Sequence, residues 1–172
     1  MSSTRRFQVT VIGRYDATDE QYTIGREIGK MLAELNLIAI TGGRGGLMEA
    51  VARGCSENGG ISVGILPGER FDDGNPYNTI ALPTGIGYAR NSMNVLAADV
   101  VVVVGGASGT LSEMAFAWSY RKPIIALTTS GGWAERLANQ CIDHRNDEPI
   151  IGVDSLEQLR SELQRIVGEL TL

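Results

Sequence analysis

The feature that most constrains this chain is a run of five consecutive valines, residues 100–104, followed by the glycine pair Gly105–Gly106. β-Branched residues favour extended backbone, and the run has no alternation of apolar and polar residues. Such a strand is buried on both faces, as in a parallel sheet that helices cover on both sides. The run therefore predicts an α/β fold.

Short apolar segments that end in turn residues recur along the chain. We expect further strands at residues 7–13, 37–43, 61–68, 78–82, 123–127 and 149–153. Helical spacing of apolar residues indicates helices at residues 18–35, 47–58, 89–98 and 110–120, after Gly132 and after Ser155. Alternating strands and helices predict a Rossmann-like domain, with a doubly wound, mostly parallel sheet and helices on both faces.

Length and composition limit the class of protein. The chain has 172 residues, 43% of them hydrophobic, so residues 1–172 are expected to form a single Rossmann-like domain. No apolar segment approaches the roughly 20 residues that a membrane span needs. Residues 1–8 do not resemble a signal peptide. We therefore expect a cytoplasmic protein without a membrane partner.

Charge and cysteine content argue against further classes of function. The formal net charge of −5 argues against a nucleic-acid partner, because the phosphate backbone is bound by clustered Lys and Arg. Cys55 and Cys141 lie far apart, and His144 is the one histidine. We therefore expect reduced thiols, no disulfide framework and no metal site.

Two glycine-rich turns follow predicted strands. The first contains Gly42, Gly43, Arg44, Gly45 and Gly46, and the second contains Gly105, Gly106, Ser108, Gly109 and Thr110. The first N–H groups of a helix lack partners and favour an anion, and glycine lets the backbone approach phosphate. We predict a phosphate-binding site, while tight packing of a strand against a helix explains a single glycine turn equally well. Neither turn matches a P-loop or GxGxxG, which disfavours hydride transfer.

Three polar side chains complete the predicted site. Arg90 and Asn91 follow two glycines at the expected start of a helix, where a cation is unfavourable for the helix dipole. We therefore predict that Asn91 contacts the ligand and that Arg90 contacts the ligand or the acid beside it, with a surface ion pair as the alternative for Arg90. Glu113, three residues after Thr110, is predicted either to line the site or to cap the helix as the acid of a Thr-x-x-Glu box.

Three motifs together resemble the LOG-like superfamily of Rossmann nucleotide-binding proteins, formerly called lysine decarboxylase-like, which includes the DprA-related group. They are TGGRGGLMEAV (41–51), PTGIGYARN (83–91) and GGASGTLSEMA (105–115). The resemblance extends over about residues 7–170 and is strongest to the branch of the molybdenum cofactor carrier proteins. The hydrolase branch, which cleaves cytokinin riboside 5′-monophosphates, carries PGGxGTxxE with an upstream arginine. By that match Arg90 would hold the substrate and Glu113 would be the catalytic residue.

The chain departs from the hydrolase motif at two points. Val104 stands in place of its proline, and Ala107 and Ser108 separate the glycine pair from Gly109 where the hydrolases have one residue. A displacement of about 1 Å can cost about a hundredfold in rate. We therefore expect a binding or carrier protein without turnover, acting on a phosphorylated, nucleotide-like ligand.

The resemblance implies that the carried ligand is the molybdenum cofactor, a pterin with one phosphate. It also implies a homodimer or homotetramer, which we expect to pair through the helices at 89–98 and 110–120, and molybdoenzymes or cofactor-synthesis proteins as partners. Two alternatives stay open. One is an N-glycosidic phosphoribohydrolase acting on nucleoside 5′-monophosphates, and the other is a non-catalytic nucleotide-sensing domain.

Overall fold

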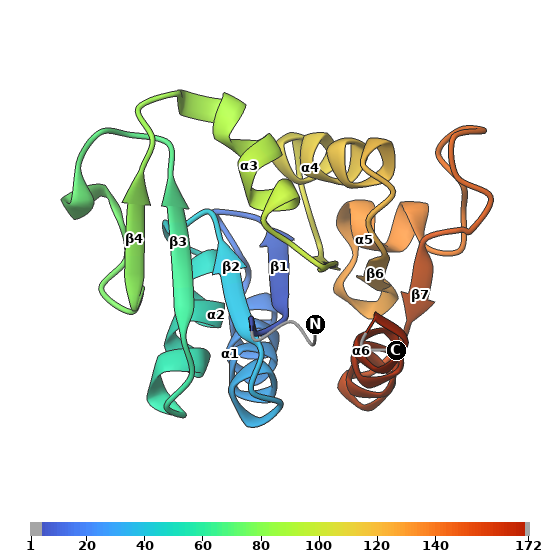
Figure 1. Ribbon diagram of the computed structural model, residues 1–172, viewed down its shortest axis with the longest axis horizontal. Helices are drawn as coiled ribbons and strands as arrows, with labels where there is room; N and C mark the ends of the chain where they lie inside the picture. The colour runs from blue at the N-terminus through green and yellow to red at the C-terminus, as the bar shows by residue number, and fades with distance from the viewer. Residues whose placement is uncertain (1–4, 171–172) are drawn as a thin grey trace.

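The valine run forms β5 (Val100–Val104) of a seven-stranded sheet in the computed structural model, which describes residues 5–170 (Figure 1). All five valines are buried. β5 pairs in parallel with β1 (Gln8–Gly13) on one side and β6 (Ile124–Leu127) on the other. The other strands are β2 (Ile38–Thr41), β3 (Ser62–Leu66), β4 (Ile80–Pro83) and β7 (Ile151–Val153).

Within residues 5–170, five α-helices and three short 3₁₀ turns connect the strands, and a sixth α-helix follows β7. The helices are α1 (Asp19–Glu34), α2 (Leu47–Glu57), α3 (Asn91–Leu96), α4 (Ser108–Ser119), α5 (Gly132–Leu137) and α6 (Leu156–Leu170). The 3₁₀ turns are η1 (Phe71–Asp73), η2 (Gly87–Arg90) and η3 (Thr128–Ser130). The ranges predicted from the sequence agree with these bounds to within a few residues, and the six strand pairings are all parallel.

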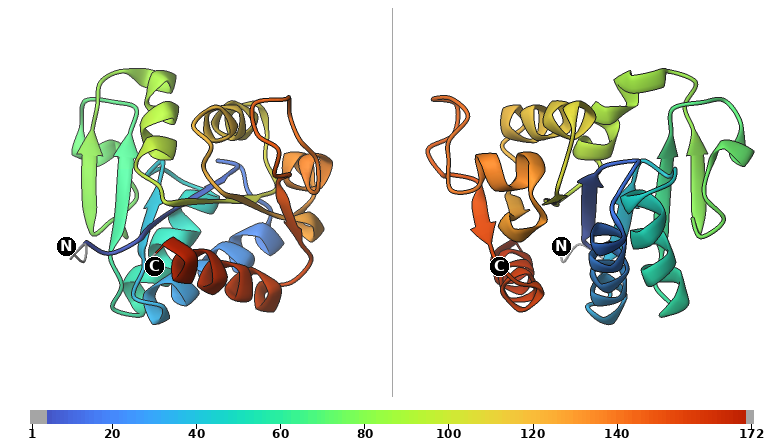
Figure 2. Two further views of the ribbon diagram at one scale, coloured as in Figure 1. Left: turned by 45° about the vertical axis from the view of Figure 1, so that its right-hand side comes forward. Right: turned by 180° about the vertical axis from the view of Figure 1, so that it is seen from behind.

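The valines of β5 alternate between two hydrophobic cores. Val100, Val102 and Val104 pack in one core with residues of α1, α2 and α6. Val101 and Val103 pack in the other with residues of α3, α4 and α5. Accordingly, α1 and α2 lie behind the strands in Figure 1 and in front of them in the reverse view of Figure 2. The predicted Rossmann-like fold, with helices on both faces, is confirmed.

The strand order indicates where a ligand site is expected. It is β4-β3-β2-β1-β5-β6-β7, so the chain builds outward from β1 in one direction and then returns to β5 to build in the other. Ligands of such sheets bind beyond the carboxyl ends of the strands where the order reverses, which here is between β1 and β5. Helices α3 and α4 lie side by side at the end toward which β1 and its neighbours point (Figure 1). Among residues 5–170, no helix is long and apolar enough to cross a membrane.

Candidate functional site

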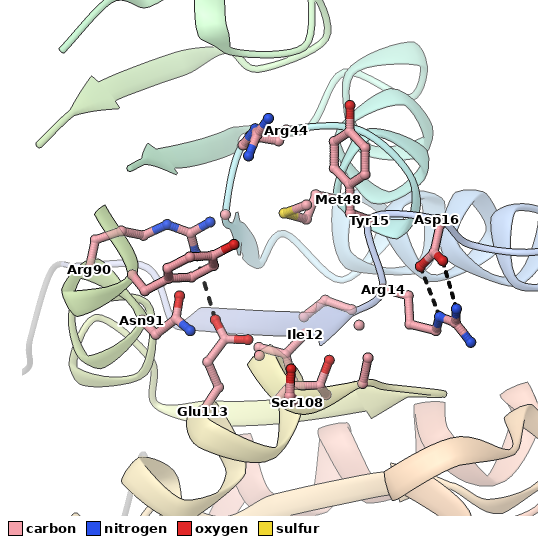
Figure 3. A pocket seen from close by; sticks show the side chains of 17 residues that line it. Ile12, Arg14, Tyr15, Asp16, Arg44, Met48, Arg90, Asn91, Ser108 and Glu113 are labelled. Atoms are coloured by element: carbon pink, nitrogen blue, oxygen red, sulfur yellow. Dashed lines mark hydrogen bonds and ion pairs between the residues drawn. The ribbon is translucent and has the colours of Figure 1, made fainter. Parts of the chain in front are cut away.

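A cavity of about 330 Å³ lies at this reversal point (Figure 3). Its walls come from the end of β1, the turn after β2, the start of α3 and the N-terminus of α4. It brings together eight residues that the sequence predicted for the site: Gly42, Arg44, Arg90, Asn91, Ser108, Gly109, Thr110 and Glu113. The three sequence motifs therefore converge on one cavity.

The remaining predicted glycines shape the turns and do not line the cavity. They are Gly43, Gly45, Gly46, Gly105 and Gly106. Gly105 and Gly106 have φ of +61° and +117°, a region that favours glycine, and the Gly105 N–H donates to Ser130 Oγ at 2.7 Å. Only part of the predicted set of glycines therefore lines the cavity.

The N-terminus of α4 faces the cavity with free amides. The first helical hydrogen bond of α4 runs from Leu111 N–H to the Ala107 carbonyl, at 3.0 Å. The amides of Ser108, Gly109 and Thr110 precede that bond, and within the described residues no side chain caps the helix. Uncapped amides at the positive end of a helix dipole stabilise an anion.

Arg90 and Glu113 form a buried pair in the cavity wall. Their side chains are 10% and 9% exposed, and Arg90 Nη1 lies 3.8 Å from Glu113 Oε1, so the ion pair is not on the surface. Arg90 Nε has no hydrogen-bond partner within residues 5–170. A Cβ on Gly42 would lie 2.5 Å from the Arg90 guanidinium, so Gly42 makes room for this cation. Burial lowers the pKa of Arg90 while Glu113 opposes that effect, and the guanidinium remains charged. A buried, incompletely paired cation is suited to an anionic ligand.

Glu113 lines the cavity and does not cap α4. The helix begins at Ser108 with Ala107 as its N-cap, so the predicted capping box at Thr110 is wrong. The Glu113 carboxylate accepts a hydrogen bond from Asn94 Nδ2 at 2.8 Å. Burial raises the pKa of Glu113 to about 7, against the opposing effects of Asn94 and Arg90. A carboxyl group with such a pKa can hold or release a proton near neutrality.

Sequence reasoning missed the loop that follows β1. Arg14, Tyr15 and Asp16 line the cavity, as do Met48 and the strongly exposed Tyr88. The signal was present, because β1 ends in Gly13, and a glycine directly follows β2 and β5. The first strand of a doubly wound sheet borders the crevice at its carboxyl end, so the triplet after that glycine could have been predicted to reach the ligand.

The fold and the site define a Rossmann-like α/β protein whose cavity lies where the strand order reverses. The chain belongs to the SLOG cluster4 family, with a match that extends over residues 6–160. This confirms the resemblance to the LOG-like and DprA-related superfamily.

The chain is also similar to solved structures and to a curated protein. The molybdenum cofactor binding protein from the phototrophic bacterium Rippkaea orientalis is 31% identical, with a TM-score of 0.86 over 96% of this chain and 99% of that chain. The molybdenum cofactor carrier protein from Chlamydomonas reinhardtii is 28% identical, with a TM-score of 0.84 over 95% of this chain and 99% of that chain. An uncharacterized protein of Archaeoglobus fulgidus is 39% identical over 120 residues, which are 70% of this chain and 79% of that protein.

Proposed function

We propose that this chain binds and carries a phosphorylated, nucleotide-like ligand, and that the ligand is the molybdenum cofactor. The observation that carries the proposal is the convergence of two anion-binding elements on one cavity. These elements are the uncapped start of α4 and the incompletely paired guanidinium of Arg90. In this arrangement the phosphate of the ligand lies against the amides of Ser108–Thr110 and close to Arg90.

Two further observations support a small cargo. The cavity of about 330 Å³ lies at the lower end of the range of about 300–1,000 Å³ for small-molecule sites. The relatives from Rippkaea orientalis and Chlamydomonas reinhardtii are described as molybdenum cofactor binding and carrier proteins, and both align over nearly the whole chain.

A phosphoribohydrolase acting on nucleoside 5′-monophosphates is the second candidate, and Glu113 is the observation that favours it. A buried carboxyl group with a pKa of about 7 beside Arg90 could activate water or stabilise an oxocarbenium-like sugar. The two-residue spacer before Gly109 argues against it, because it alters the turn that leads into α4. If the chain neither carries molybdenum cofactor nor cleaves nucleoside monophosphates, a nucleotide-sensing domain without turnover is the remaining function.

Binding and turnover assays distinguish these functions. Under anaerobic conditions, the purified chain should bind molybdenum cofactor released from a molybdoenzyme and protect it from oxidation. It should not release free base from AMP. Release faster than about 0.1 per second, abolished in Glu113→Gln, would replace the carrier proposal with the hydrolase. Failure of both assays would leave the sensing domain.

A pair of glycine variants ties the result to the cavity. A Cβ on Gly109 would meet no atom within 4 Å, so Gly109→Val projects into open space at the cavity wall and should abolish binding in a folded protein. Gly168→Val is the matched control, because Gly168 is also helical and its Cβ also meets nothing within 4 Å. Unchanged affinity in Gly109→Val would remove the α4 amides from the site.

We also propose that the chain forms a homodimer or homotetramer through α3 and α4. These helices pack side by side and leave four large apolar side chains partly exposed: Met93, Leu96, Phe116 and Tyr120. Apolar patches of this kind commonly mark interfaces. Molybdoenzymes or cofactor-synthesis proteins as acceptors, a cytoplasmic location and the lack of a nucleic-acid partner remain predictions.

A further inference from the structure

The loop after β1 forms a part of the cavity that is chemically different from the anion-binding part. Figure 3 shows Tyr15 and Asp16 across the cavity from Arg90 and Glu113. Neither of the two lies in a glycine turn or helps to bind phosphate in the proposed function. A ligand whose phosphate lies at the start of α4 would extend from there toward the other residues that line the cavity, which include these two.

Asp16 lines the cavity with a carboxylate side chain that is 71% exposed and pairs with Arg14. Arg14 Nε donates to Asp16 Oδ1 at 2.9 Å, and Arg14 Nη2 donates to Oδ2 at 2.7 Å. The loop is held in turn by the start of α2, because the Arg14 carbonyl accepts from Leu47 N–H at 3.0 Å. Arg14 also lowers the pKa of Asp16, so the carboxylate stays ionised. An ionised carboxylate only accepts hydrogen bonds, and each oxygen has a lone pair left beyond the one that Arg14 uses.

Tyr15 adds an aromatic wall beside this carboxylate. The ring is 60% exposed, and the Arg44 guanidinium lies 5.0 Å from its centroid. A Cβ on Gly45 would lie 3.2 Å from Tyr15 Cε2, so the absence of a side chain at Gly45 makes room for the Tyr15 ring. Met48 contributes a polarisable thioether to the same cavity. Aromatic rings, guanidinium planes and thioethers all contact the faces of planar rings favourably.

We propose that Tyr15 and Asp16 form a subsite for a planar heterocycle that carries an amino group next to a ring N–H, the donor pair shared by pterins and guanine. This assignment rests on the proposed function, since the heterocycle belongs to the phosphorylated ligand. Two adjacent donors match the two oxygens of Asp16. Adenine instead places a ring acceptor beside its amino group, and that acceptor would face a carboxylate oxygen with no proton between them.

Calorimetry with two matched pairs of probes tests the subsite. GMP and AMP share the sugar phosphate, while pterin and lumazine share the fused ring and differ in the amino group. We expect the donor-bearing member of at least one pair to bind about tenfold more tightly. The pair that shows the preference identifies the source of the ring as guanine or pterin. Equal affinity within both pairs would overturn the subsite.

Variants test whether the loop after β1 causes the preference for the donor-bearing probe. Asp16→Asn should remove the preference within the pair, because an amide offers one donor group and one acceptor and no longer selects two adjacent donors. Asp72→Asn is the matched control, because Asp72 is also an exposed carboxylate paired with the arginine two residues before it, Arg70, and it does not line the cavity. A preference that survives Asp16→Asn, or that Asp72→Asn also removes, would overturn the role of Asp16.

A further variant separates the subsite from the anion site. Equal affinity within both pairs, together with nucleotide binding that Gly109→Val abolishes, would overturn the subsite and leave the proposed function standing. If the wild-type chain binds none of the two nucleotides, the two pteridines and inorganic phosphate, both the subsite and the proposed function are overturned. Tyr15→Leu should weaken both members of the preferred pair by about tenfold without changing the preference between them, and an unchanged affinity would remove Tyr15 from the subsite.

Discussion

Glu113 should make the folded chain less stable as the pH rises through neutrality. Its pKa rises from an ordinary 4.5 to about 7 on folding, mainly because of burial. Between those two values the folded chain keeps a proton that the unfolded chain has released, so the free energy of unfolding falls as the pH rises. Each pKa unit corresponds to about 1.4 kcal/mol, which gives a loss of about 3 kcal/mol that is complete above pH 7 and absent below pH 4.5.

Urea denaturation of the wild type and Glu113→Gln measures this loss. Glutamine cannot ionise, and its carbonyl oxygen can still accept from Asn94, the partner of Glu113 in the wild type. We expect the variant to be more stable than the wild type by about 3 kcal/mol at pH 8 and by less than about 1 kcal/mol at pH 5. Glu27→Gln, at an exposed position of α1, is the control and should show no such change. A constant difference between wild type and Glu113→Gln from pH 5 to 8 would refute the reasoning.

Three further predictions follow from the site and the fold. Arg90→Ala should weaken the binding of inorganic phosphate at least about tenfold in calorimetry; equal affinity in a folded variant would place the anion elsewhere. Ser130→Ala leaves the buried Gly105 N–H without its partner and should cost about 1–3 kcal/mol in urea denaturation, with a loss below about 0.5 kcal/mol counting against it. Leu96→Glu, on the exposed apolar face of α3, should give a monomer in light scattering; a monomeric wild type would contradict the proposed oligomer.

The fold class could be predicted from the sequence because its signals are local. The valine run and the glycines after the strands specify buried parallel strands without reference to distant residues. The same holds for the glycine turns of the site, since each strand that borders the cavity ends near a glycine, whereas the strand order that places the reversal between β1 and β5 is not local. The start of α4 was predicted two residues too late, because a Thr-x-x-Glu pattern indicated a cap at Thr110 while the helix begins after an extended Ala107.

The electrostatics of the site could not be predicted in the same way. The hydrogen-bond partner of Glu113 is Asn94, on a different helix, and the burial that raises the pKa of Glu113 exists only in the folded chain. The fit of Arg90 against Gly42 likewise depends on two turns that are far apart in the sequence. Such contacts are decided by tertiary structure, and neither spacing nor residue type indicates them.

A crystal structure of the chain loaded anaerobically with molybdenum cofactor tests the central claim most directly. The anomalous signal of molybdenum locates the cargo, and the density locates its phosphate. We predict the phosphate within hydrogen-bond distance, about 2.7–3.2 Å, of the amides of Ser108, Gly109 and Thr110, with the Arg90 guanidinium beside it. Cofactor bound away from the start of α4, or an empty cavity at saturating cofactor, would contradict the account.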